Sequence, residues 1–121
     1  KINFLNPFDL DLIENKSKFI YCASGTYRLA IRGDGGVYPC VYAFYDEKFL
    51  MGNIKAADIS EIWRSKKWDL FRGKIKKTDL LQCLKCKYFN NCGLKNCRLR
   101  GYYLIGDLFS PYPNCRYYLR L

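Results

Sequence analysis

Alternating apolar and polar side chains predict a β-hairpin in the first half of the chain. The alternation runs over residues 27–32, as in a strand with one buried face. A Gly-Asp-Gly-Gly run at 33–36 then predicts a tight reversal, with Gly35 as the structural turn residue, because glycine readily adopts the positive φ of hairpin turns. Residues 37–42 return as a second strand. We therefore expect one hairpin here.

An amphipathic helix is the next element that the pattern predicts. A short apolar stretch at 44–50 and a turn at 51–54 precede it. Asp58 suits the N-cap, with Glu61 three residues later as in a capping box, and Gly73 suits the end. The apolar residues expected on one face are Ile59, Ile62, Trp63, Leu70 and Phe71. We expect this face, together with Trp68, to serve packing, and a binding role for the two tryptophans is the less favoured alternative.

The rest of the chain predicts little regular structure. Turn-forming residues between Cys97 and Cys115 indicate an irregular loop. We expect a small α+β domain stabilised by a metal or cluster and built from the hairpin, one amphipathic helix and cysteine-rich irregular loops. Residues 1–21 are expected to connect into this domain, which would span residues 22–116, with 117–121 as a tail.

Seven cysteines point to metal chemistry. Four lie within fifteen residues in the pattern C-x2-C-x5-C-x4-C, and thiolates are ligands that suit zinc and iron–sulfur clusters. These four are Cys83, Cys86, Cys92 and Cys97, and the other three are Cys22, Cys40 and Cys115. The hairpin would bring Cys22 and Cys40 close together at its two ends. Buried thiols or a disulfide are the simpler alternative, but the cysteines are too dense to favour it.

The cellular setting is inferred from the same cysteines. Their number is odd, and the N-terminus has no apolar signal-peptide core, so a reducing cytoplasm fits better than secretion. No run of about 18 apolar residues predicts a membrane span. The chain begins with Lys1 rather than Met, which we interpret as a fragment of a longer protein.

The net charge and the absence of histidine limit the classes of function that this chain can have. Without histidine, Cys2His2 zinc fingers and Ser–His or Cys–His catalysis are excluded for this chain. The formal charge of +10 suits an acidic partner, which could be a small electron carrier, a peptide or nucleic acid. A solvated basic surface with no partner is an equally good explanation of the charge.

The order of the cysteines resembles a known domain. A Gly-x4-Cys ending at Cys40, the central four-cysteine run and a final Cys115 are similar to the SPASM domain, the auxiliary-cluster domain of many radical S-adenosylmethionine enzymes. Three short motifs also match the family: G-G-V-Y-P-C at 35–40, G-N-I at 52–54 and E-I-W at 61–63. The resemblance covers roughly residues 20–116.

The resemblance implies two [4Fe-4S] clusters. Cys22, Cys40 and Cys97 would ligate the first, and the second would be ligated by Cys83, Cys86, Cys92 and Cys115. Bound clusters would contribute strongly to folding, as metals do in small domains. Because two such cores and seven thiolates lower the formal charge by only about three, the domain would stay basic.

Two departures concern the first cluster. The last spacing of the central run is x4, one residue longer than the family pattern. Some relatives also carry an eighth cysteine soon after the first, and no cysteine lies between Cys22 and Cys40. The first cluster would therefore have an open iron, a non-cysteine ligand or an incomplete core.

The resemblance also limits what the chain does alone. It lacks the C-x3-C-x2-C run that binds the radical-generating cluster, and it is too short for a (β/α) barrel. The radical S-adenosylmethionine core would then belong to the same parent chain. There this domain would relay electrons, or position a peptide or protein substrate for modification, with an acidic electron donor as a further partner.

Two other functions remain open at this point. A zinc-binding module that engages nucleic acid or protein is suggested by the basic charge and by aromatic residues interleaved with Arg and Lys. Zinc could also replace clusters after aerobic preparation. Alternatively, clusters or zinc could serve only as structural staples in a binding module.

Overall fold

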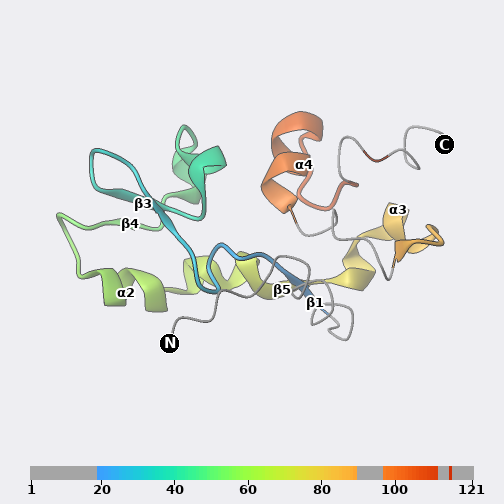
Figure 1. The fold of residues 1–121 in the computed structure, drawn as a ribbon, viewed down its shortest axis with the longest axis horizontal. Helices are drawn as coiled ribbons and strands as arrows, with labels where there is room; N and C mark the ends of the chain where they lie inside the picture. Colours follow the sequence, from blue (N-terminus) through green and yellow to red (C-terminus); the bar gives the residue numbers. More distant parts are fainter. Residues whose placement is uncertain (1–18, 90–96, 112–114, 116–121) are drawn as a thin grey trace, which may run out of the picture. The chain divides into compact units, whose positions relative to one another are not determined.

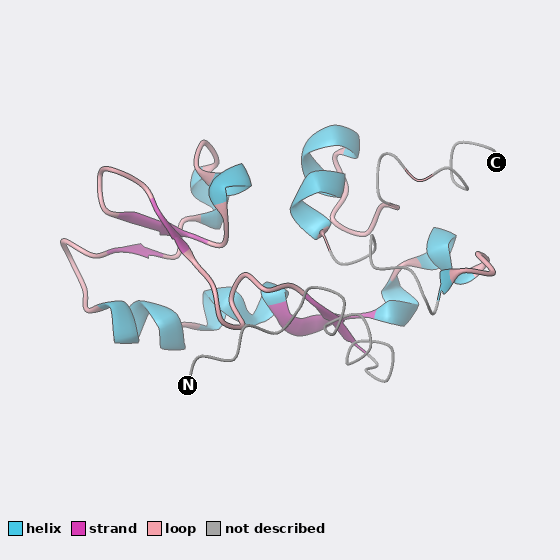
Figure 2. Cartoon of the chain, viewed as in Figure 1, coloured by secondary structure: helices cyan, strands magenta, loops and turns pink. Residues whose placement is uncertain are grey.

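The computed structural model describes residues 19–89, 97–111 and 115 of the chain, and shows a mixed α+β structure with short elements (Figures 1 and 2). It divides into two compact units, which we call the hairpin unit (Tyr21–Ile75) and the cysteine-rich unit (Lys1–Ile20 with Lys76–Leu121). No helix of the described residues has the length and apolar character needed to cross a bilayer.

The strands are short and form two sheets. One sheet has the order β1–β5 and the other the order β2–β3–β4. The strands are β1 (Phe19–Tyr21), β2 (Ala30–Ile31), β3 (Gly36–Tyr38), β4 (Gly52–Asn53) and β5 (Arg72–Lys76). The helical elements are η1 (Val41–Ala43), η2 (Glu47–Phe49), α2 (Ile59–Arg64), η3 (Lys66–Phe71), η4 (Lys77–Asp79), α3 (Leu81–Leu84) and α4 (Arg98–Ile105).

The predicted hairpin is present as β2 and β3. The two strands pair antiparallel, with Ala30 opposite Tyr38, and β4 adds to the other edge of β3. Gly35 adopts a φ of +87° in the connecting turn, and a Cβ there would lie 2.7 Å from Asn53 Oδ1. The turn therefore needs glycine for its conformation and for the close approach of β4.

A charged network holds the turn. The Arg32 guanidinium contacts Asp34 at 2.7 Å and Glu47 at 3.2 Å, and it also donates to the carbonyl of Phe44. The Tyr38 hydroxyl donates to Glu47 at 2.9 Å. The Arg32 guanidinium, followed by the Gly36 N–H, holds the pKa of the Asp34 carboxyl well below its usual range. These contacts connect the hairpin to the segment that follows Cys40.

The predicted helix is broken in two. Asp58 does cap α2, although its carboxylate accepts the N–H of Ser60 rather than that of Glu61. α2 ends at Arg64, and the next residue, Ser65, has extended backbone angles and caps η3 by accepting the N–H of Lys67 at 3.2 Å. A serine competes for backbone bonds in this way, so it favours a new start over continuation. Helical structure ends at Phe71, and Gly73 lies within β5 instead of ending the helix.

The core of the hairpin unit lies between the β2–β3–β4 sheet and the helices. Trp68 is fully buried and its Nε1 donates to the carbonyl of Ile62 at 2.7 Å. A Cβ on Gly52 would lie 2.9 Å from Ile62, so α2 packs directly against β4. The other buried apolar side chains of this unit are Val37, Tyr38, Ala43, Phe49, Met51, Phe71 and Ile75. The packing role expected for Trp68 is confirmed.

The cysteine-rich unit contains a helix that the sequence did not predict. Residues 98–105, expected to be part of an irregular loop, form α4, so that expectation is wrong for this segment. α4 ends at Ile105 and is capped by Gly106, whose φ is +87° and whose N–H donates to the carbonyl of Tyr102 at 2.7 Å. Residues 1–18 and 116–121, and hence most of the connecting segment and all of the tail, lie outside the described residues.

Candidate metal centre

Cys22 begins a tightly closed loop of the hairpin unit. Its carbonyl accepts the Thr26 hydroxyl at 2.8 Å. Gly25 has a φ of +78°, and a Cβ there would lie 3.0 Å from the buried Trp68 ring. The guanidinium of Arg72 also donates to the carbonyl of Gly25. The loop is therefore fixed to the core, and a partly exposed thiol at its start has rigid support.

Cys40 lies two residues after β3 and is the N-cap residue of η1. Its backbone is extended, and its carbonyl accepts the N–H of Ala43 at 3.1 Å. Continuing the β2–β3 register by two pairs puts residue 28 opposite Cys40. The N–H of Arg28 donates to the carbonyl of Ala23 at 3.1 Å, so the loop folds back on itself. We infer that this loop returns Cys22 toward the end of the hairpin that carries Cys40.

The C-x2-C pair belongs to the cysteine-rich unit. Cys83 lies in α3, and the N–H of Cys86 donates to its carbonyl at 2.9 Å, which closes a turn between the two residues. Both side chains are partly exposed. Lys85 and Lys87 are exposed beside them, and positive charge there favours an anionic thiolate-bound centre.

Cys97 is the N-cap residue of α4. The next residue, Arg98, is only 4% exposed and donates to the carbonyls of Leu108 and Ser110 at 3.2 and 2.7 Å. This contact ties the start of the helix, and with it Cys97, to the loop that leads toward Cys115. Cys115 is partly exposed. Cys92 lies outside the described residues.

Sequence reasoning missed Arg98 as a positioning residue for Cys97. A basic residue next to a cysteine is usually solvated, and nothing in the local pattern indicates that this one is buried. Because residues 98–105 were expected to form a loop, nothing indicated that Arg98 lies at the start of a helix, where its side chain can fix the position of Cys97.

The described residues do not by themselves form a closed ligand set. Within them, no three Cys, Asp or Glu side chains gather where they could hold one metal ion. Of the first predicted set, Cys22 and Cys40 belong to the hairpin unit and Cys97 to the cysteine-rich unit. Of the second set, Cys83, Cys86 and Cys115 are described and all belong to the cysteine-rich unit. The assignment of ligands to two clusters stays a prediction.

The donor chemistry fits a thiolate-bound centre. None of the six described cysteines is in a disulfide, and each is partly exposed. The disulfide alternative therefore fails for these six. Sulfur donors without histidine or a gathered set of carboxylates suit iron–sulfur clusters or zinc rather than hard cations.

Comparison with known proteins separates these two possibilities. The SPASM model, described as an iron–sulfur cluster-binding domain, matches residues 22–87, which is more than half of the chain. The matched range includes Cys22, Cys40, Cys83 and Cys86 and ends before the last three cysteines. No curated protein and no solved structure matches the chain.

Proposed function

Because the chain belongs to the SPASM family of iron–sulfur cluster-binding domains, we propose that it is the auxiliary cluster domain of a radical S-adenosylmethionine enzyme. In this role it holds two [4Fe-4S] clusters, relays electrons and helps to position a peptide or protein substrate. The observation that carries the proposal is the family match across Cys22, Cys40 and the C-x2-C pair.

The chain's own residues would hold the two centres in different ways. Cys22, Cys40 and Cys97 supply three thiolates to the first, and the second receives four, from Cys83, Cys86, Cys92 and Cys115. When bound, such clusters supply one-electron oxidation and reduction, with potentials tuned by charge, hydrogen bonds to sulfur and exposure. Three thiolates leave one iron of the first centre without a cysteine ligand.

The radical chemistry would come from another part of the parent protein. This chain has no C-x3-C-x2-C run, so it does not supply the cluster that cleaves S-adenosylmethionine. We expect the parent to modify peptides or proteins in the cytoplasm, with an acidic carrier donating electrons to this basic domain.

Metal analysis of the anaerobically prepared chain tests the proposal. We expect about eight iron and eight sulfide per chain and an absorption band near roughly 400 nm, as thiolate-bound clusters show. Cys86→Ala should remove about half of the iron, and Cys22→Ala should affect only the other cluster. A colourless protein that takes stoichiometric zinc under iron-replete anaerobic conditions would overturn the proposal in favour of a zinc module.

A second experiment separates electron relay from structural stapling. In the full-length parent, Cys115→Ala should abolish turnover even in molecules whose hairpin unit stays folded and still binds substrate, because the second cluster would be lost as a redox centre. Loss of folding alone, with turnover per folded molecule unchanged, would show that the cluster is only a staple.

A further inference from the structure

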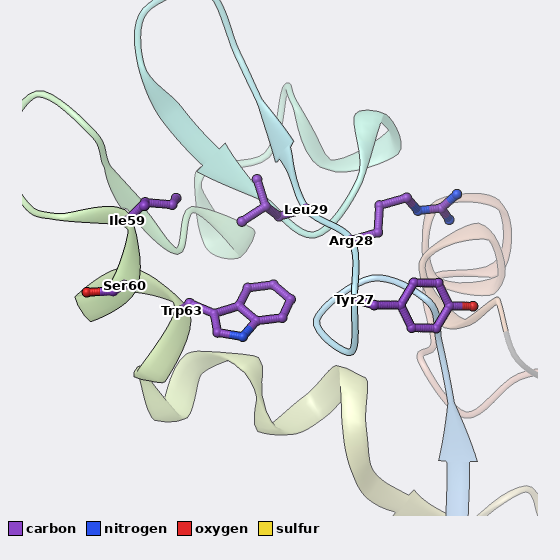
Figure 3. Close-up of a pocket in the computed structure, with 6 residues that line it drawn as sticks. All are labelled: Tyr27, Arg28, Leu29, Ile59, Ser60 and Trp63. Carbon is purple, nitrogen blue, oxygen red and sulfur yellow. The ribbon is translucent and has the colours of Figure 1, made fainter. Parts of the chain in front are cut away.

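The hairpin unit contains an open pocket that the proposed cluster ligands do not use. Its volume is about 350 Å³. Figure 3 shows Ile59, Ser60 and Trp63 on α2, with the Ser60 hydroxyl turned away from Trp63, and the other lining residues on the loop before β2, where Tyr27 and Arg28 extend away from α2. Those other residues are Tyr27, Arg28 and Leu29. The lining is mainly apolar, with the Arg28 guanidinium and the hydroxyls of Tyr27 and Ser60 at its edge.

The two tryptophans differ in what they do. Trp68 is fully buried and hydrogen-bonded to the backbone, so it packs the core. Trp63 lines the pocket and stays partly exposed, although its ring lies 5.1 Å from that of Trp68 and 4.5 Å from the Arg72 guanidinium carbon. An aromatic ring that is held in place and still accessible is typical of a binding hot spot.

Ile59, like Trp63, lines the pocket and remains accessible to solvent. It lies four residues before Trp63, on the same face of α2, where the sequence predicted packing. It is nevertheless 41% exposed and lines the pocket. Tyr27, at the opposite side, is 58% exposed. These side chains together form an apolar surface that solvent still reaches.

The charges around the pocket are asymmetric. Arg28 is exposed and, within the described residues, has no ion pair and no side-chain hydrogen bond. On the α2 side, Asp58 and Glu61 are exposed on either side of Ile59 and Ser60. A bound carboxylate would therefore be attracted toward Arg28 and repelled from α2.

We propose that this pocket binds a peptide segment in which a large apolar side chain lies next to an aspartate or glutamate. The apolar side chain contacts Trp63, Ile59 and Leu29, and the carboxylate pairs with Arg28. The choice of a peptide as the occupant rests on the proposed function, in which this domain positions a peptide or protein substrate. The pocket adds the substrate feature that would be recognised.

Size and charge argue against other occupants. A volume of about 350 Å³ lies at the low end of ligand pockets, enough for one or two side chains and small for a nucleotide cofactor. Single-stranded nucleic acid needs a groove with several cations along the backbone, whereas here Arg28 lines the pocket, Arg72 is stacked on the Trp63 ring, and two acidic residues lie on the α2 side. A single anchor with one ion pair suits an extended peptide.

Calorimetric titration of the anaerobically prepared full chain tests the proposal. The probes are a capped peptide Gly-Gly-Asp-Phe-Asp-Gly-Gly, one variant with alanine for phenylalanine and another with asparagine for both aspartates. We expect the first to bind and each variant to bind at least about fivefold more weakly, as loss of an anchor predicts.

Matched substitutions in the protein locate the site. Ile59→Ser should weaken binding about five- to tenfold, whereas Ile54→Ser, at a residue 44% exposed and outside the pocket, should change it less than about twofold. Arg28→Gln should remove the preference for aspartate over asparagine, whereas Arg64→Gln, also exposed but outside the pocket, should keep it. Both pairs change surface residues, so folding should survive.

Three results would overturn the proposal. They are the absence of binding up to about 1 mM peptide, equal losses for Ile59→Ser and Ile54→Ser, or binding of an eight-nucleotide oligothymidylate in place of the peptide. Iron and sulfide are measured on the same samples. If the chain binds the peptide but takes up no iron, only the cluster proposal is overturned. If the iron-loaded chain does not bind the peptide, only the pocket proposal is overturned.

Discussion

The hairpin unit and the cysteine-rich unit are stabilised in different ways. In the hairpin unit, a three-stranded sheet and two helical segments surround a core that includes the fully buried Trp68. In the described part of the cysteine-rich unit, the buried apolar side chains are those of Leu80, Leu99 and Pro111. Among the described residues of that unit are Cys97 and three of the four cysteines predicted to bind the second cluster.

The difference indicates where a bound cluster matters most for folding. A unit with a packed core has hydrophobic burial to offset its conformational entropy, and a small unit with little apolar burial usually needs a metal or cross-link. We therefore expect the hairpin unit to keep its structure without metal, and the cysteine-rich unit to depend on its cluster.

Removing the clusters should produce the largest effect. After chelation of iron from the anaerobically loaded chain, amide exchange in residues 83–89 and 97–105 should approach that of an unfolded peptide. Exchange in β3 and β4 should stay slow, because their ladder is supported by the core. The comparison would fail if both units lost protection together, and hydrogen exchange with mass spectrometry measures it.

Trp68→Ala should be the most destabilising single substitution in the hairpin unit. It removes a fully buried ring and its hydrogen bond to Ile62, so the free energy of unfolding should fall by about 3–5 kcal/mol. Trp63→Ala is the control, and it should cost about half as much because Trp63 is only partly buried. Urea titration followed by circular dichroism gives both values, and equal losses would contradict the division of roles.

Alanine substitutions at three glycines test how a positive φ and steric crowding each contribute to the loss of stability. Gly35→Ala should cost about 2–3 kcal/mol, because a positive φ and a 2.7 Å approach to Asn53 both oppose a side chain. Gly106→Ala should cost about 1–2 kcal/mol, since it has the same φ with open space around it. Gly33→Ala has neither obstacle and should change stability by less than about 1 kcal/mol. Urea midpoints that do not follow this order would refute the account of the turn.

Acid should weaken the turn by a small amount. Because Arg32 lowers the pKa of Asp34 in the folded state, the unfolded chain binds more protons, and stability falls as the pH drops below about 4. Asp34→Asn keeps an acceptor for the Gly36 N–H but removes the charge. Its cost in urea midpoint should therefore be larger at pH 6 than at pH 3, and an equal cost at both pH values would exclude the ion pair as the cause.

The parts of the fold that sequence reasoning found are those with local causes. Alternation and the glycine turn sufficed for the hairpin, and Asp58 marked the start of α2. The helix was predicted too long because Ser65 caps a second segment, which depends on a local competition between a side chain and the backbone. α4 was missed because Gly101 lowers its helix propensity; its close approach to Ser110 is a tertiary contact.

The candidate site, like the fold, could be predicted from the sequence only in part. Cysteine spacing pointed to the family, and the family match over residues 22–87 confirms it. Spacing cannot show how far apart those sulfurs lie, because a bound centre, rather than backbone preference, would determine their separation. Trp63 and Ile59 were assigned to packing, since periodicity does not show which apolar side chains of a helix remain uncovered.

The pairing of β1 with β5 has a consequence for how this domain can be engineered. The hairpin unit begins at Tyr21, in β1, and ends at Ile75, in β5, so its entry and exit strands run side by side at about 4.8 Å. Neighbouring ends are what allow a segment to be excised, grafted into a surface loop of a host or circularly permuted without stretching the chain. We therefore expect residues 21–75 to tolerate transfer into another protein as one unit.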